Sequence, residues 1–302
     1  MRQRWGLAVL AAIVCGLAPA ATYAQTTTTV GDVKITRDVE YAKVGDQSLK
    51  LDYATPAAAK SKPPLVVWIH GGGWVGGNRA NPPVAFLINQ GYALASISYR
   101  FSDKAVYPAQ IHDCKGAIRY LRANAEKIGF DPERIGVAGG SAGGHLVALL
   151  GTTAGEKELE GEVGGNLDQS SRVQAVCDIY GPSDLLLDET NGGEKWNPAA
   201  TELVRKLLGG PRLEKSALAK LASPVYFVSE DDAPFLIIHG DKDDLVYPSQ
   251  STRLLKALQE AKVPAELDLV KGAGHGGPQF GEPSRRDRIT KFFDAHLKSS
   301  AK

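Results

Sequence analysis

Residues 135–147 read Ile-Gly-Val-Ala-Gly-Gly-Ser-Ala-Gly-Gly-His-Leu-Val. The first residues have the apolar character of a buried strand, and the last have the apolar spacing of a helix. Gly139-Gly-Ser-Ala-Gly143 lies between them, and a sharp strand-to-helix turn needs small residues on both sides of its serine. The context predicts that Ser141 is a nucleophile. The alternative is a glycine-rich turn that binds phosphate at a helix N-terminus.

Strand patterns alternate with helix patterns on both sides of this turn. Apolar runs predict buried strands over residues 64–69, 92–98, 134–137, 174–179, 234–238 and 265–270. Apolar residues at three- and four-residue spacing predict helices over residues 108–128, 143–150, 248–261 and 285–297. This alternation indicates an α/β fold with a mostly parallel sheet of about eight strands and helices on both faces.

Three other segments complete a single predicted domain over residues 37–302. Residues 37–56 alternate apolar and polar positions on either side of Gly45-Asp46, which predicts an antiparallel pair at a sheet edge. Residues 151–172 and 182–222 are rich in glycine and charge, with one short helix expected over residues 201–208. We expect both to be lid-like excursions over the functional site.

Residues 1–24 have the layout of a signal peptide. Arg2 and Arg4 precede an apolar stretch that ends in small residues, so cleavage is expected after Ala20 or Ala24. The apolar run is shorter than the ~20 residues that a membrane-spanning helix needs, which disfavours an anchor. We therefore expect an exported protein, periplasmic or extracellular, whose mature chain begins with a flexible segment over residues 25–36.

Composition excludes some classes of partner and site. The chain has 302 residues, with 35 Lys+Arg against 34 Asp+Glu and no long run of like charge, so a nucleic-acid partner is not expected. Beyond the signal segment, Cys114 and Cys177 are far apart in sequence and have no His cluster beside them, so no metal site is predicted. A disulfide is conceivable in an oxidising compartment, but buried free thiols are favoured.

His70-Gly-Gly-Gly-Trp74 follows directly on the predicted strand over residues 64–69. Glycines allow backbone N–H groups to point inward, where they can bind an oxygen that becomes negative during acyl transfer. We expect the N–H groups of Gly72, Gly73 and Ala142 to form such an oxyanion hole. Trp74 is the candidate substrate-binding residue, and its bulk beside this loop predicts a preference for short acyl chains.

Two later loops offer a general base and an acid. His275 follows the last predicted strand on a glycine-rich loop, where a flexible backbone can present an imidazole. Asp241, Asp243 and Asp244 follow the strand over residues 234–238, and each is a candidate acid, although any one of them could instead cap the next helix. The chain order serine, aspartate, histidine is the order found in one class of serine hydrolase.

These motifs resemble those of the α/β-hydrolase esterases, in particular the branch with bacterial feruloyl and acetyl-xylan-type esterases and hormone-sensitive-lipase-like enzymes. The resemblance covers residues 38–297 and includes Asp131-Pro-Glu-Arg-Ile135, Asp178-Ile-Tyr-Gly-Pro-Ser-Asp184 and residues 234–246. The family carries its acid on the second Asp of His-Gly-Asp-x-Asp-x-Leu-Val, which implies Asp243 here.

The resemblance implies a serine carboxylesterase that works through an acyl-enzyme and needs no cofactor. Its expected substrates are short-chain or plant-polysaccharide-type esters with acetyl or feruloyl groups, either small molecules or carbohydrate-linked. An arylformamidase-like amide hydrolase is one alternative, which a signal peptide disfavours. A non-catalytic binding module is another, which the presence of every candidate chemical residue disfavours.

Overall fold

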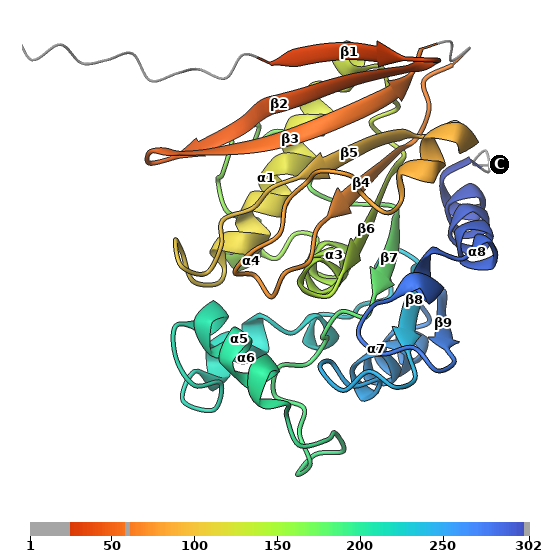
Figure 1. The fold of residues 1–302 in the computed structure, drawn as a ribbon. Helices are drawn as coiled ribbons and strands as arrows, with labels where there is room; N and C mark the ends of the chain where they lie inside the picture. Colours follow the sequence, from red (N-terminus) through yellow and green to blue (C-terminus); the bar gives the residue numbers. More distant parts are fainter. Residues whose placement is uncertain (1–24, 58–60, 299–302) are drawn as a thin grey trace, which may run out of the picture.

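The computed structural model describes residues 25–57 and 61–298, which form a nine-stranded sheet flanked by helices (Figure 1). The strands are β1 (Thr26–Val30), β2 (Val33–Val44), β3 (Gln47–Pro56), β4 (Leu65–Ile69), β5 (Ala93–Ile97), β6 (Ile135–Gly140), β7 (Ala175–Ile179), β8 (Phe235–Gly240) and β9 (Ala265–Val270). The helices are α1 (Ala109–Ala123), α2 (Ala125–Ile128), α3 (Ala142–Thr152), α4 (Lys157–Glu160), α5 (Pro198–Leu208), α6 (Ser216–Leu221), α7 (Ser249–Glu260) and α8 (Pro283–Phe293). Short helical turns are η1 (Ala85–Gln90), η2 (Pro224–Tyr226), η3 (Pro278–Gly281) and η4 (Asp294–Lys298).

The strand order is β1-β2-β3-β5-β4-β6-β7-β8-β9. Strands β1, β2, β3 and β5 pair antiparallel, and all pairs from β5 to β9 are parallel. Parallel strands end at the same edge of a sheet, so the loops after β4, β6, β8 and β9 lie near one another. Ligands of open α/β sheets bind at this edge.

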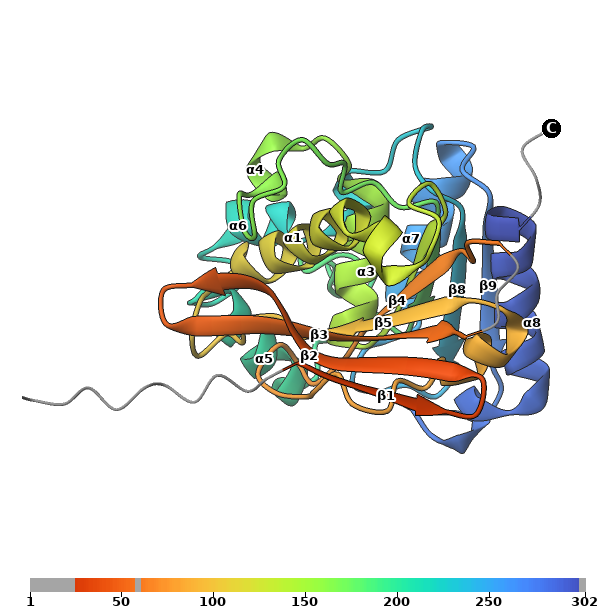
Figure 2. The same ribbon diagram turned by 90° about the horizontal axis from the view of Figure 1, so that it is seen from above.

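Both faces of the central strands, β4 to β8, are buried. Leu65, Val67 and Ile69 of β4 pack into one core cluster with residues of α1, α3 and α7, while Val66 and Trp68 pack into a second cluster with residues of η1 and α8. Figure 2 shows α8 on the opposite side of the sheet from α1 and α3. Because alternate residues face opposite layers and both layers are apolar, such strands are continuous apolar runs in the sequence.

The structure corrects the expectation of a flexible segment over residues 25–36, because most of this part of the chain forms strands of the sheet. Thr26–Val30 forms β1, which pairs antiparallel with the start of β2 around a turn at Gly31, where φ is 56°. All five β1 side chains are exposed, so no apolar alternation indicated a strand. Its order comes from backbone pairing and the β propensity of threonine, and it makes the sheet nine-stranded instead of eight-stranded. The predicted signal segment lies outside the described residues.

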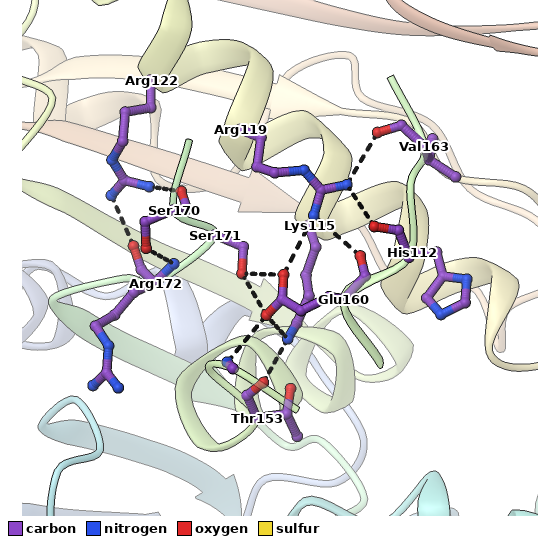
Figure 3. A network of polar contacts seen from close by, with 12 residues as sticks. His112, Lys115, Arg119, Arg122, Thr153, Glu160, Val163, Ser170, Ser171 and Arg172 are labelled. Atoms are coloured by element: carbon purple, nitrogen blue, oxygen red, sulfur yellow. Dashed lines mark hydrogen bonds and ion pairs between the residues drawn. The ribbon is translucent and has the colours of Figure 1, made fainter. Parts of the chain in front are cut away.

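The excursion over residues 151–172 packs against α1 (Figure 3). Glu160 accepts a hydrogen bond from Nζ of Lys115 at 2.7 Å, and its two carboxylate oxygens share the hydroxyl hydrogen of Ser171. Arg119 donates to the carbonyl oxygens of Gly161 and Glu160. The expectation that this excursion covers the site is wrong, because buried cations of α1 need its carboxylate and carbonyl groups as acceptors.

The excursion over residues 182–222 lies near the strand ends and holds two helices, α5 and α6, where one was expected. Figure 1 draws both below the sheet. Tyr107 donates its hydroxyl hydrogen to the carbonyl oxygen of Leu221 at 3.0 Å, which attaches this segment to the start of α1. Helix α6 is only six residues long, too short for helical periodicity to appear in the sequence.

Candidate active site

Ser141 occupies the turn between β6 and α3, in strained backbone geometry. Its φ is 56° and its ψ is −119°, a region that residues with a side chain rarely adopt. A Cβ atom at Gly139 would lie 2.3 Å from the carbonyl oxygen of Gly143, and one at Gly143 would lie 2.0 Å from that of Ile69. The glycines therefore permit the close packing that holds the serine at the carboxyl end of β6.

Three side chains from three loops form a hydrogen-bonded chain. Oγ of Ser141 lies 2.8 Å from Nε2 of His275, and Nδ1 of His275 lies 2.7 Å from Oδ2 of Asp243. Because an ionised carboxylate only accepts hydrogen bonds, Nδ1 of the neutral imidazole carries the proton and Nε2 is the acceptor for the serine hydroxyl. Chemically, this arrangement can remove a proton from the serine and stabilise the resulting imidazolium.

Asp243 is only 3% exposed, yet its environment favours the charged form. Oδ1 accepts hydrogen bonds from the backbone N–H groups of Leu245 and Val246, both at 3.0 Å. Burial acts to raise the pKa of Asp243, but hydrogen bonds with His239 and His275 outweigh it and hold that pKa well below its usual value. The carboxylate beside the imidazole is therefore anionic over the physiological pH range.

The three candidate acids have different surroundings. Asp241 accepts a hydrogen bond from the backbone N–H of Gly272 at 2.7 Å, so it ties together the loops after β8 and β9. Asp244 is exposed, and its backbone carbonyl oxygen accepts a hydrogen bond from the Asn197 side chain at 2.9 Å. Of the three, the structure brings Asp243 to the imidazole.

The loop after β4 presents unused backbone donors. Within the part of the chain that the structure describes, the N–H groups of Gly72, Gly73 and Ala142 donate no hydrogen bond. Gly72 has a φ of 112°, and a Cβ there would lie 2.3 Å from the carbonyl oxygen of Gly76. Free N–H groups beside a serine hydroxyl can bind an oxyanion, and both glycines line a hollow that also includes Ser141.

Two hollows meet at Ser141. The narrow cavity has a volume of about 40 Å³, and the wide cleft has one of about 440 Å³. The narrow cavity is lined by Gly73, Trp74, Ser141, Pro182, Leu187, Glu194, Trp196, Asn197, Ala200, Leu203, Val204, Leu245, Val246, Tyr247, Ser249 and Gln250. The wide cleft is lined by Trp68, Gly71, Gly72, Gly73, Pro83, Gly140, Ser141, Tyr180, Leu203, Leu245 and His275. Of these two hollows, His275 lines only the wide cleft.

Trp74 lines the narrow cavity, but its indole N–H points elsewhere. This group donates to Nδ1 of His145 at 3.2 Å, and Nε2 of His145 lies 2.6 Å from the carbonyl oxygen of Ala222. Since indole is only a donor, Nδ1 is unprotonated and Nε2–H donates to Ala222. Burial lowers the pKa of His145 to about 4, so the ring is neutral at pH 7. A ligand can therefore contact Trp74 only through its ring.

Tyr180 belongs to the site, although the sequence did not single it out. Its ring centroid lies 4.9 Å from that of His275, and it has a φ of 47° directly after β7. It lines the wide cleft and packs against Phe280 at 4.7 Å between centroids. Tyr180 belongs to the segment Asp178–Asp184, which is part of the family resemblance and comes at the end of a predicted strand. That position is the signal in the sequence that could have identified Tyr180 as a site residue.

Residues 25–57 and 61–298 contain no group of three or more His, Cys, Asp or Glu side chains placed to hold a metal ion. Cys114 and Cys177 are both buried free thiols, and burial raises the pKa of each. None of the helices in these two ranges is long and apolar enough to span a membrane.

Comparisons with known proteins agree on the family. The BD-FAE family model matches residues 51–258. Esterase LipQ of Mycobacterium tuberculosis is 33% identical over 230 residues, which cover 75% of this chain and 53% of that protein. The truncated form of a carbohydrate esterase from gut microbiota has a TM-score of 0.79 and 34% identity, over 88% of this chain and 96% of the other. The propionate-bound esterase Est2 of Thermogutta terrifontis has a TM-score of 0.71 and 25% identity, over 85% and 93% of the two chains.

The chain spans about half the length of the curated relatives it matches. The family model nevertheless covers most of the sheet, from β3 to α7, together with the serine turn and the aspartate loop. The strand order and the structural likeness fit the predicted fold class, which is thereby confirmed. This chain belongs to the BD-FAE family and has the α/β-hydrolase fold of esterases related to hormone-sensitive lipase.

Proposed function

We propose that the protein is a serine carboxylesterase that removes short acyl groups, acetyl above all, from carbohydrate alcohols. The observation that carries this proposal is the hydrogen-bonded chain from Ser141 through His275 to Asp243. The esterases and the carbohydrate esterase among its relatives support the reaction and the class of alcohol.

The reaction begins when His275 takes the hydroxyl proton of Ser141 at Nε2. The serine oxygen attacks the ester carbonyl carbon, and the N–H groups of Gly72, Gly73 and Ala142 bind the oxygen that becomes negative. His275 then gives the proton to the leaving alcohol, which yields an acyl-enzyme. Water activated by the same imidazole hydrolyses this ester and restores the serine. Asp243 keeps the imidazole oriented throughout.

The position of His275 decides which part of the ester occupies which hollow. The leaving oxygen must come within hydrogen-bonding distance of Nε2 to receive its proton. His275 lines the wide cleft but not the narrow cavity. The alcohol part therefore lies in the wide cleft, and the acyl group enters the narrow cavity.

The size of the narrow cavity favours small acyl groups. Its volume of about 40 Å³ is much smaller than that of the wide cleft. This difference favours an acetyl group over a feruloyl group, which carries an aromatic ring. The wide cleft, at about 440 Å³, is large enough for a sugar on the alcohol side.

We propose further that the enzyme acts outside the cytoplasm, in the periplasm or the medium. The basic, apolar and small-residue regions of residues 1–24 support this location. Mass spectrometry of protein recovered from the periplasm or medium should find a mature chain that starts after Ala20 or Ala24. Recovery of peptides that contain Met1 or Trp5 from that fraction would contradict the proposal.

The test is a panel of esters assayed with the mature protein. Nitrophenyl acetate and butyrate should be hydrolysed faster than laurate below its micelle concentration, and methyl ferulate and N-formylkynurenine should be poor substrates. Val204→Ala, which widens the narrow cavity, should shift the preference from acetate toward butyrate. Faster turnover of laurate or ferulate than of acetate by the unmodified protein would refute the assignment of the narrow cavity.

Ser141→Ala should abolish turnover without changing the circular dichroism spectrum. Loss of the nucleophile removes the covalent route, and triad knockouts cost ~10⁶ in turnover in a well-studied serine hydrolase. The kinetic assay uses nitrophenyl acetate, with Ser229→Ala as the control, because that hydroxyl bonds to Asp231 and Asp232 and lines neither hollow at Ser141. Substantial activity in Ser141→Ala would refute the assigned nucleophile.

A further inference from the structure

Another hollow adjoins the wide cleft at Tyr180. This hollow, the aromatic pocket, has a volume of about 250 Å³ and shares Trp68, Pro83 and Tyr180 with the wide cleft. Its remaining walls include Phe86, Phe280 and Arg286. Because three residues line both hollows, the aromatic pocket is next to the wide cleft that His275 lines.

Aromatic rings form much of its surface. Tyr180 and Phe280 meet edge to face, with centroids 4.7 Å apart and an interplanar angle of 86°. Phe86 lies under the guanidinium of Arg286, whose central carbon is 5.6 Å from the ring centroid. All three rings are partly exposed to solvent. Partly exposed rings offer flat apolar faces and edges, which suit the C–H faces of a sugar ring.

The arginines of α8 differ in their partners. Arg285 lies 3.2 Å from a carboxylate oxygen of Asp268, and Arg288 lies 3.1 Å from one of Glu266. Arg286 forms no ion pair with any residue in the ranges 25–57 and 61–298, and it is the arginine of this helix that lines the aromatic pocket. Its guanidinium therefore has donors left for a carboxylate, which it can bind through two parallel hydrogen bonds.

We propose that the aromatic pocket is a subsite for a uronic acid residue in the alcohol part of the substrate. This inference rests on the proposed function, which places the alcohol in the wide cleft. A sugar next to the acylated one would pack on Phe86 and Phe280, and its carboxylate would pair with Arg286. A purely apolar alcohol would use the rings but leave the guanidinium without a partner.

The experiment compares two acetylated xylo-oligosaccharides that differ only in a glucuronic acid residue beside the acetylated sugar. The ratio of kcat/KM for the acidic and neutral substrates is measured in the mature protein. We expect about a tenfold preference for the acidic substrate, the size of one charge-assisted hydrogen-bonded contact. Arg286→Gln should reduce this ratio to near one, mainly through KM. Arg288→Gln, on the same helix but paired with Glu266, is the matched control and should keep the ratio.

A binding measurement separates the subsite from catalysis. Calorimetry with Ser141→Ala should show tighter binding of the deacetylated acidic oligosaccharide than of its neutral counterpart, and addition of Arg286→Gln should remove the difference. Equal binding of both oligosaccharides, or an acidic preference that survives in Arg286→Gln, would overturn the subsite. Failure of the unmodified protein to hydrolyse nitrophenyl acetate would refute the proposed function instead, because that small ester does not need the aromatic pocket.

Discussion

The buried imidazole of His145 predicts a specific loss of stability in acid. It is fully buried between Trp74 and Ala222, and burial lowers its pKa from 6.5 to about 4. In the unfolded chain the ring regains its ordinary pKa of ~6.5. Between these two values the unfolded state binds more protons than the folded state, so stability rises with pH and is lost as pH falls.

The magnitude follows from the two pKa values. A difference of about 2.5 units corresponds to about 3.4 kcal/mol, at ~1.36 kcal/mol per unit, once the pH is below 4. The same linkage gives a loss of about 2 kcal/mol between pH 7 and pH 5. A loss of this size is a substantial part of the ~5–15 kcal/mol that stabilises a typical protein.

The assay is urea unfolding at pH 7, 6 and 5 of the unmodified protein and His145→Gln. Glutamine keeps a donor near Ala222 and does not titrate. The comparison is needed because burial raises the pKa of Asp178 to about 6, and that carboxyl makes the folded state more stable as pH falls through 6. The free energy of unfolding of His145→Gln should fall by about 2 kcal/mol less than that of the unmodified protein from pH 7 to pH 5. Parallel pH dependences for the two proteins would refute the reasoning.

Two further substitutions test the acid and the buried cation. Asp243→Asn should lower turnover of nitrophenyl acetate by up to ~10⁴-fold, because it destroys the orientation of the imidazole. Asp241→Asn and Asp244→Asn should stay near the unmodified rate, and an inactive Asp244→Asn beside an active Asp243→Asn would move the acid by one residue. Glu160→Gln should lower the free energy of unfolding by about 3 kcal/mol, because Lys115, with a side chain 1% exposed, loses its carboxylate partner (Figure 3). Urea unfolding measures this loss, and a change below about 1 kcal/mol would show that Lys115 does not depend on the ion pair.

Most of the sheet was predictable because its strands have two buried faces. A strand such as β4 or β6 is then a continuous apolar run, and its carboxyl end marks where a loop begins. The loops with Ser141, Asp243 and His275 were predictable for the same reason. Strand β1 and helix α6 were not predictable. Strand β1 has only exposed side chains, and helix α6 is only six residues long.

The placement of the excursions could not be predicted from composition. Glycine and charge indicate chain outside the sheet, but they do not say which surface the chain covers. Residues 151–172 pack on α1 because Lys115 and Arg119 on that helix need acceptors from them. Those two side chains are far from the excursion in sequence, so their requirement becomes visible only when the helix is placed in the fold.

The sequence by itself determined the serine turn, the order of the three chemical residues and the glycine loop. Each depends on neighbours along the chain: small residues at a sharp turn, and a loop at the end of an apolar strand. The family pattern pointed to Asp243, and the tertiary structure placed that carboxylate against His275. Tertiary structure alone decided that Tyr180 packs beside His275 and how much space lies on each side of Ser141. These features depend on side-chain directions and on contacts between segments that are distant in sequence, and a linear pattern of residue types contains neither.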